Sequence, residues 1–296
     1  MEQITRIKLT VAYDGTNYHG WQFQPNVNTI EGELKRAIAG LINEEFTLIG
    51  ASRTDTGVHA LCNVAVFNTT SPIPPEKISH ALNQRLPEDI RVQTSEAVAL
   101  DFHPRKVESR KTYQYRIWNA RIPQPTKRLY HHFIHQHLDI SFMQTAAAYL
   151  VGEFDFLSFC TAKKKTGIKG PDSLAESTVR TIYFADVTSI PDYSTNNCAD
   201  DTSSLDIPGS AQNTANNTTP HEIIITLTGN GFLYNMVRII AGTLIEVGIG
   251  RYPPERINEI LAAGDRTLAG PTAPPQGLTL VKYEYLQPVS LLPQST

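Results

Sequence analysis

The stretch IKLTVAYDG, residues 7–15, decides the fold class. Apolar residues alternate in it with smaller or polar ones, which is the period of a strand with one buried face. The alternating apolar residues are Ile7, Leu9, Val11 and Tyr13, and Asp14-Gly15 follows them as a turn. We therefore expect the chain to begin with a strand rather than with a signal peptide.

Outward from this strand, helices and further strands alternate irregularly. Asn28 and Glu31 can form a capping box, and apolar residues at 30, 34, 38, 41 and 42 then line one helix face. Strands are expected at 46–51, 61–68, 91–98, 112–118, 179–187, 223–227 and 278–285, and helices at 78–86, 142–151, 233–247 and 254–263. Because some strands follow each other directly, this order favours an α+β fold with mixed, largely antiparallel sheets flanked by helices.

Strand-helix-strand groupings occur on both sides of residue 105, without an exact sequence repeat. They predict two similar half-domains with an active-site cleft between them: residues 1–105, with the loop around Asp55, and residues 106–296. Within the second half, residues 188–220 are rich in Ser, Thr, Asn, Asp and Pro and hold no Lys or Arg. Such a segment buries too little apolar surface to order itself, so a flexible surface insertion is expected there.

Composition narrows the class of protein. The net charge of −3 does not favour nucleic-acid binding. Basic residues nevertheless cluster at 105–106, 110–111, 127–128 and 163–165. Such clusters usually belong to a solvated surface, and a phosphate-binding groove is the less common but more specific interpretation. The three cysteines, at wide spacings, fit neither a disulfide framework nor a paired metal site. With no apolar stretch long enough for a membrane helix, a cytoplasmic protein is expected.

The stretch ASRTDTGVHA, residues 51–60, holds the Asp-Thr-Gly tripeptide of aspartic proteases around Asp55. A simple turn, with Gly57 at positive φ, is one interpretation. The protease interpretation requires two facing carboxylates that share a proton, and this chain has one such motif. Arg53 beside the site would favour the ionised carboxylate instead, so a protease is disfavoured.

Arg238 lies in GFLYNMVRIIAGTLIEVGIG, residues 231–250, a helix that is apolar nearly all round. A buried guanidinium needs an anion, and no carboxylate lies three or four residues away on this helix. The anion must come from elsewhere in the fold or from a ligand. A structural ion pair and a counter-charge for an ionised Asp55 both remain open.

Tyr113, next to Arg110 and Lys111 in the expected strand at 112–118, is a core residue by default. If exposed, its ring would offer a surface on which a base could stack while neighbouring cations, Lys111 and Arg105 among them, hold phosphates. The histidines of HHFIHQH, residues 131–137, lack carboxylates or cysteines at ligand spacing, so an exposed strand is expected there and no metal site.

Five stretches in order resemble the motifs of the tRNA pseudouridine synthase A family. They are YDGTNYHGWQFQ at 13–24, ASRTDTGVHA at 51–60, KTYQYRIWN at 111–119, GFLYNMVRIIAG at 231–242 and TAPPQGL at 272–278. Ser52 and Thr56 stand where Gly and Ala are frequent in the family, and the 188–220 segment has no counterpart in its pattern.

The resemblance implies an isomerase that converts uridine to pseudouridine at positions 38–40 of the tRNA anticodon stem-loop, as a homodimer and without metal or cofactor. It implies that Asp55 is the catalytic carboxylate, acting as a nucleophile or as a base at the sugar, and that Arg238 holds it ionised. By the same resemblance Arg53 helps extrude the uridine, Tyr113 stacks on the uracil, and Leu278 is an apolar wall. A catalytically silent tRNA-binding module is the alternative.

Overall fold

The computed structural model describes residues 4–161, 177–192 and 220–287. Within them the strands are β1 Thr5–Tyr13, β2 Ile49–Gly50, β3 His59–Thr69, β4 Ile90–Val98, β5 Ser109–Asn119, β6 His132–Ile134, β7 Gly152–Asp155, β8 Val179–Pro191, β9 His221–Gly229 and β10 Leu278–Tyr285. The α-helices are α1 Ile30–Ala39, α2 Ile78–Asn83, α3 Ile140–Ala148, α4 Met236–Gly248 and α5 Arg256–Ala263.

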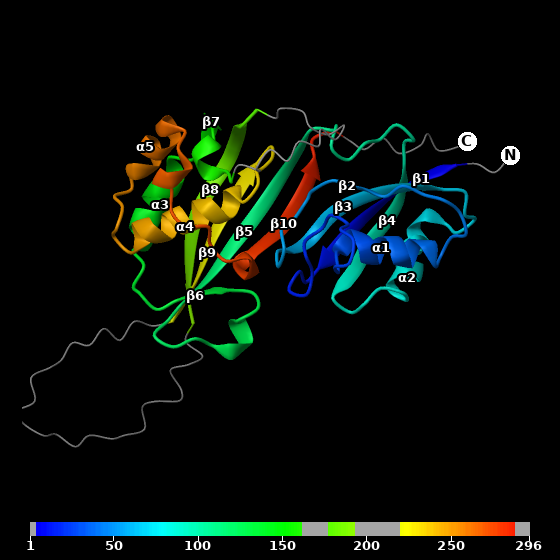
Figure 1. Cartoon of the computed structure of the whole chain (residues 1–296), viewed down its shortest axis with the longest axis horizontal. Coiled ribbons are helices and arrows are strands. Elements are labelled where there is room, and N and C mark those ends of the chain that lie inside the picture. The colour runs from blue at the N-terminus through cyan, green and yellow to red at the C-terminus, as the bar shows by residue number, and fades with distance from the viewer. Residues whose placement is uncertain (1–3, 162–176, 193–219, 288–296) are drawn as a thin grey trace, which may run out of the picture.

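All of these strands belong to one sheet, whose main path runs β4-β1-β3-β10-β5-β9-β8-β7 (Figure 1). Every neighbouring pair is antiparallel except β3 with β10 and β5 with β6. The α+β class with a mixed, largely antiparallel sheet is therefore confirmed.

The two predicted halves share this sheet and meet where β10 lies beside β3. That contact is short, because only Thr279 with His59 and Leu280 with Ala60 pair across it. Helices α1 and α2 lie over the strands of the first half, and α3, α4 and α5 lie with those of the second (Figure 1). One apolar core nevertheless runs through both, because it contains inward residues of β1, β5, β9 and β10. The division at residue 105 stays a prediction.

The opening strand has the expected alternation, since Ile7, Leu9, Val11 and Tyr13 are all buried. The expected cap of α1 is wrong by one residue. Thr29 has an extended backbone, and its side chain accepts a hydrogen bond from the Gly32 amide, so the helix begins at Ile30. Glu31 instead accepts a bond from the amide of Phe23.

Some element boundaries also differ from the expected ones. Of the strand expected at 46–51, only β2, residues Ile49–Gly50, pairs with a neighbouring strand. Phe46 lies before it and packs edge-on against Phe67. α4 begins at Met236, later than expected, because Asn235 adopts a left-handed conformation with φ 62°. β8 extends to Pro191, so the insertion expected at 188–220 begins with ordered strand; its residues 193–219 lie outside the described part.

The helix α4 lies directly against the segment that leads into β10. Almost every residue of α4 is buried, and a Cβ built on Gly242 would lie 1.8 Å from the carbonyl oxygen of Pro271. Because a backbone oxygen cannot move aside as a side chain can, only glycine allows this approach.

Gly242→Ala should lower the free energy of unfolding by roughly 1–3 kcal/mol, because the overpacking outweighs the better helix propensity of alanine. Gly40→Ala is the control, since Gly40 has an ordinary helical φ of −75° and its Cβ would meet nothing closer than 3.5 Å. Urea denaturation checks both variants. Equal stability of Gly242→Ala and the unchanged protein would contradict the close approach.

Candidate active site

Asp55 and Arg238 come together from opposite halves of the chain. Asp55 lies in the loop between β2 and β3, and Arg238 lies in the first turns of α4. Nη1 of Arg238 is 3.8 Å from Oδ2 of Asp55, and the two side chains are 16% and 26% exposed. The anion that the helix could not supply to Arg238 is thus the carboxylate of the Asp-Thr-Gly stretch. A guanidinium at this distance favours the ionised carboxylate.

Two further hydrogen bonds orient the guanidinium. Nε of Arg238 donates to the carbonyl oxygen of Ala273 at 2.7 Å, and Nη1 donates to Oδ1 of Asn235 at 3.0 Å. The segment before β10 and the left-handed residue before α4 therefore aim the charge at Asp55.

The stretch at residues 13–24 holds the Asp55 loop in place. The amide of Trp21 donates to the carbonyl of Thr54, the amide of Gly57 donates to the carbonyl of Tyr18, and the hydroxyls of Tyr13 and Thr54 lie 2.7 Å apart. Gly57 has a φ of 76°, as the turn interpretation required. The loop is thus a turn that is fixed on both sides of Asp55.

Tyr113 and Leu278 lie on adjacent strands beside this pair. They are only 7% and 5% exposed, and Tyr113 packs edge-on against Phe232. The idea of an exposed tyrosine platform is therefore wrong, because burial in the sheet covers most of the ring. Burial, and then the nearby Tyr13 and Asp55, raise the pKa of Tyr113 far above its usual value, so its phenol stays neutral.

The predicted basic residues separate into two places. Arg53 is exposed two residues before Asp55. Nε of Arg105 donates to the carbonyl of Gly50, and the positive charge of Arg105 helps to lower the pKa of Lys111 on β5. Burial, followed by the charges of Arg180 and Arg105, lowers the pKa of Lys111 to about 8. Arg180, on β8, is a third cation of this cluster, and nothing in its sequence surroundings marked it.

His59 is a residue that the sequence analysis did not single out. Its Nδ1 accepts from the amide of Gly15 at 3.0 Å, and its Nε2 lies 3.1 Å from the carbonyl of Leu129 and 3.2 Å from that of Gln276. Nε2 is within hydrogen-bonding distance of both carbonyl oxygens. His59 thereby ties the strand after the Asp55 loop to three distant segments.

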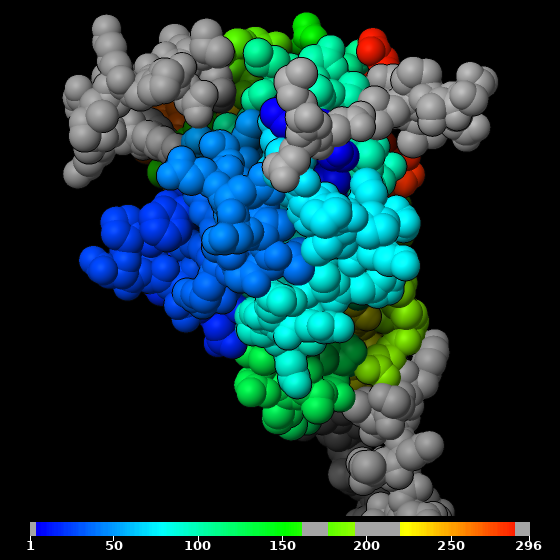
Figure 2. Space-filling view, turned by 90° about the vertical axis from the view of Figure 1, so that its right-hand side faces the viewer, coloured from blue at the N-terminus to red at the C-terminus, as the bar shows by residue number. Residues whose placement is uncertain are grey.

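The carboxylate of Asp14 completes this network. It lies 3.1 Å from Nδ1 of His59 and accepts a hydrogen bond of 2.7 Å from the hydroxyl of Tyr130. The segment around Tyr130, green in the space-filling view, lies below the N-terminal half (Figure 2). Since β3 and β10 pair at only two positions, His59 adds a second tie between the halves that carry Asp55 and Arg238.

The predicted histidine stretch and the predicted cleft are not observed at the contact between Asp55 and Arg238. The histidines at 131–137 lie around the short strand β6, where His131 and His132 are half-buried and His135 and His137 are exposed. The described residues contain no group of three His, Cys, Asp or Glu that could hold a metal. Two hollows of the described surface are lined by residues other than Asp55, so the cleft between the halves stays a prediction. No described helix is long and apolar enough to cross a membrane.

Comparison with known proteins gives one consistent result. A family model described as tRNA pseudouridine synthase matches residues 9–105 and 146–286, and Tyr113 and Lys111 lie between these ranges. Proteins named tRNA pseudouridine synthase A from Thermoanaerobacter sp. (strain X514) and Caldicellulosiruptor bescii are 43% and 42% identical over 279 residues. Each alignment covers 94% of this chain and 99% of the relative. The protein of the same name from Brevibacillus brevis is 40% identical over 280 residues.

His59→Ala should lower the free energy of unfolding by roughly 2–4 kcal/mol, because it leaves a cavity and strands the Gly15 amide and two carbonyls. His59→Gln should lose less, since its amide can still donate to one carbonyl. Chemical denaturation measures both, with His80→Ala on the exposed side of α2 as the control. If His59→Ala were as stable as His80→Ala, the tie between the halves would lie elsewhere.

Proposed function

This chain belongs to the tRNA pseudouridine synthase A family, and from that premise we propose that it isomerises uridine to pseudouridine at positions 38–40 of the tRNA anticodon stem-loop. The observation that carries the proposal is the contact of 3.8 Å between Asp55 and Arg238, with Tyr113 and Leu278 on the strands beside it. Four of the five stretches that resemble the family each supply one of these residues.

The reaction needs an ionised carboxylate at the sugar. The bond between N1 of the uracil and C1' of the ribose breaks, the uracil turns, and C5 bonds to C1'. The hydrogen on C5 leaves as a proton, and N1 takes up a proton. Asp55 acts either by attacking C1' or by removing a sugar proton, and both routes require the charged form that Arg238 favours. No atom is gained or lost overall, so no co-reactant is required.

Tyr113 and Leu278 would hold the uracil while it turns. Leu278 would supply an apolar wall, and Tyr113 would contact the base through the small part of its side chain, 7%, that is exposed. Because its phenol stays neutral, Tyr113 can accept or donate a hydrogen bond without bringing a second negative charge near Asp55.

Binding of the RNA would rest on the cations. We propose that Lys111, Arg105 and Arg180 contact the phosphates of the tRNA, and that exposed Arg53 takes the place in the stack that the extruded uridine leaves. The same proposal includes a homodimer that acts in the cytoplasm.

Two alternatives fit the site less well. A silent tRNA-binding module would have no use for an ion pair that keeps a half-exposed carboxylate charged, and no comparison favours it. An aspartic protease needs a second carboxylate that shares a proton with the first, whereas the group that faces Asp55 here is a guanidinium.

Asp55→Ala should reduce turnover at least a thousandfold, because it removes the group that acts on the sugar. The assay is tritium release from tRNA transcripts labelled with [5-³H]uridine, since only bond formation at C5 expels that hydrogen. Binding of the transcript by the variant is the control for folding. Tritium release by Asp55→Ala at the rate of the unchanged protein would refute the assignment.

The affinity for tRNA should fall several-fold as the pH rises from 7 to 9. Lys111 titrates at a pKa of about 8 in the free protein, so above that pH it loses the charge that attracts a phosphate. Lys111→Arg should keep its affinity across this range, and Lys111→Met should bind weakly and lower the salt slope by about one. Filter binding at constant ionic strength measures all three. The same loss of affinity with pH in Lys111→Arg would assign the titration to another group.

A further inference from the structure

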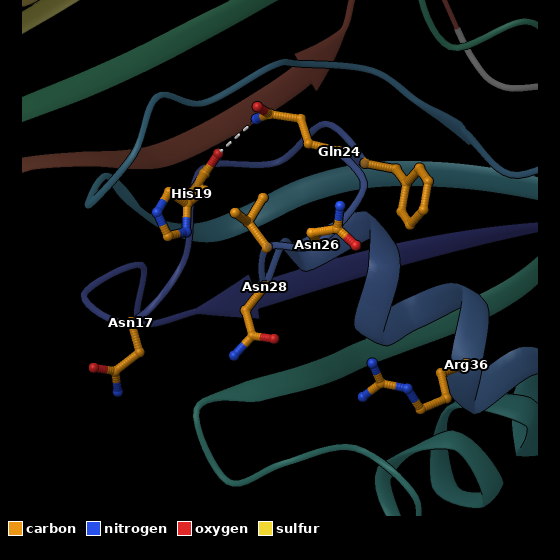
Figure 3. A pocket seen from close by; sticks show the side chains of 8 residues that line it. Asn17, His19, Gln24, Asn26, Asn28 and Arg36 are labelled. Carbon is orange, nitrogen blue, oxygen red and sulfur yellow. Dashed lines mark hydrogen bonds between the residues drawn. The ribbon is translucent and has the colours of Figure 1, made fainter.

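A polar hollow of about 480 Å³ lies in the loop that joins β1 to α1, apart from the contact between Asp55 and Arg238 (Figure 3). Its size falls within the range of small-ligand sites, about 300–1,000 Å³. The side chains that line it are Asn17, His19, Phe23, Gln24, Asn26, Val27, Asn28 and Arg36. Four of these are carboxamides, and none is acidic. Nothing in the proposed reaction uses them.

The carboxamides of this hollow are available to a ligand. Gln24 donates to the carbonyl of His19 at 3.3 Å, whereas the side chains of the three asparagines make no hydrogen bond to other described residues. In Figure 3, Asn17 and Asn28 point to the same side of the loop as Arg36. A carboxamide carries a donor and an acceptor side by side, which is the pattern that base edges present.

The rim of the hollow adds an aromatic ring and positive charge. Phe23 is 53% exposed, and Nζ of Lys35 lies 5.3 Å from the centre of its ring while it also pairs with Glu31 at 2.6 Å. Arg36 pairs with Glu33 at 2.6 Å, but its side chain is 73% exposed, and such surface pairs contribute little. An exposed ring with cations around it is the usual platform for an unpaired base and its phosphate.

The hollow is joined to the Asp55 loop by direct backbone contacts. Its loop supplies the hydrogen bonds from Trp21 to Thr54 and from Gly57 to Tyr18, and a Cβ on Gly20 would lie 2.5 Å from the Thr54 carbonyl. In the space-filling view the deep-blue segment around residues 15–30 stands out from the flank of the N-terminal half, accessible to a large partner (Figure 2). An RNA that reaches Asp55 therefore has this surface within its path.

We propose that the hollow binds an unpaired nucleotide of the same RNA whose uridine reaches Asp55, with the base against Phe23, its edge on the asparagines and its phosphate near Arg36. This inference rests on the proposed function, because it takes tRNA as the substrate. It gives the enzyme a contact with an unpaired nucleotide in addition to the uridine that reacts.

The first experiment measures tRNA affinity and turnover separately. Phe23→Ala and the double variant Asn17→Ala/Asn28→Ala should each weaken binding of an unmodified tRNA transcript about tenfold, while kcat at saturating tRNA stays within twofold. The controls are Phe142→Ala, which removes a ring that is 47% exposed on α3, and Asn258→Ala on the exposed side of α5. Both controls should bind as the unchanged protein does.

The second experiment reports on the hollow itself. In Phe23→Trp the new indole is exposed, whereas Trp21 and Trp118 are 1% and 2% exposed, so a stacked base should quench mainly the new fluorescence. Titration with the tRNA transcript should give saturable quenching with the Kd found by filter binding.

Outcomes for the hollow and for the proposed function can be told apart. Normal pseudouridine formation with unchanged affinity in both hollow variants, and no quenching in Phe23→Trp, overturns the hollow alone. Absence of tritium release from the unchanged protein overturns the proposed function, and a loss of binding in the hollow variants would then still support the nucleotide site.

Discussion

The attraction between the Arg238 guanidinium and the Asp55 carboxylate is the constraint on which the rest of this molecule depends. An arginine in a helix as buried as α4 is costly unless an anion meets it, and here the anion belongs to the other half of the chain. The same contact therefore gives the arginine of α4 an anion and joins the two halves of the chain. Arg238 also donates to Ala273 and Asn235, so the segment before β10 and the start of α4 take part in the same contact.

Much of this arrangement could be predicted from local patterns, and the exceptions have a common cause. The alternation in β1, the limits of β10 and the lack of an anion on the helix of Arg238 are local features, and each gave a correct expectation. Thr29 replaced Asn28 as the cap because either residue type can do so, and only the backbone conformation decides between them. A side chain that could cap is visible in the sequence, but the residue at which the chain turns is not.

The residues that were missed act over long distances in the sequence. His59 contacts the carbonyls of Leu129 and Gln276, and Arg180 approaches Lys111 from β8. Neither relation has a spacing that a pattern could reveal, since each depends on the order of strands in the sheet. The burial of Tyr113, by contrast, was the default expectation, and the position of β5 between β10 and β9 agrees with it.

The place of β10 in the sheet has a consequence for how the protein is made. β10 follows every other described strand in the sequence, yet it lies in the middle of the sheet, between β3 and β5. During translation the start of β3, His59 and Ala60, has no β10 partner until residues 278–285 are synthesised, whereas Ala65 and Val66 of the same strand already pair with β2. The nascent chain therefore cannot join the strands of its first half to β5, β9, β8 and β7 through β10 before this last described strand has been made.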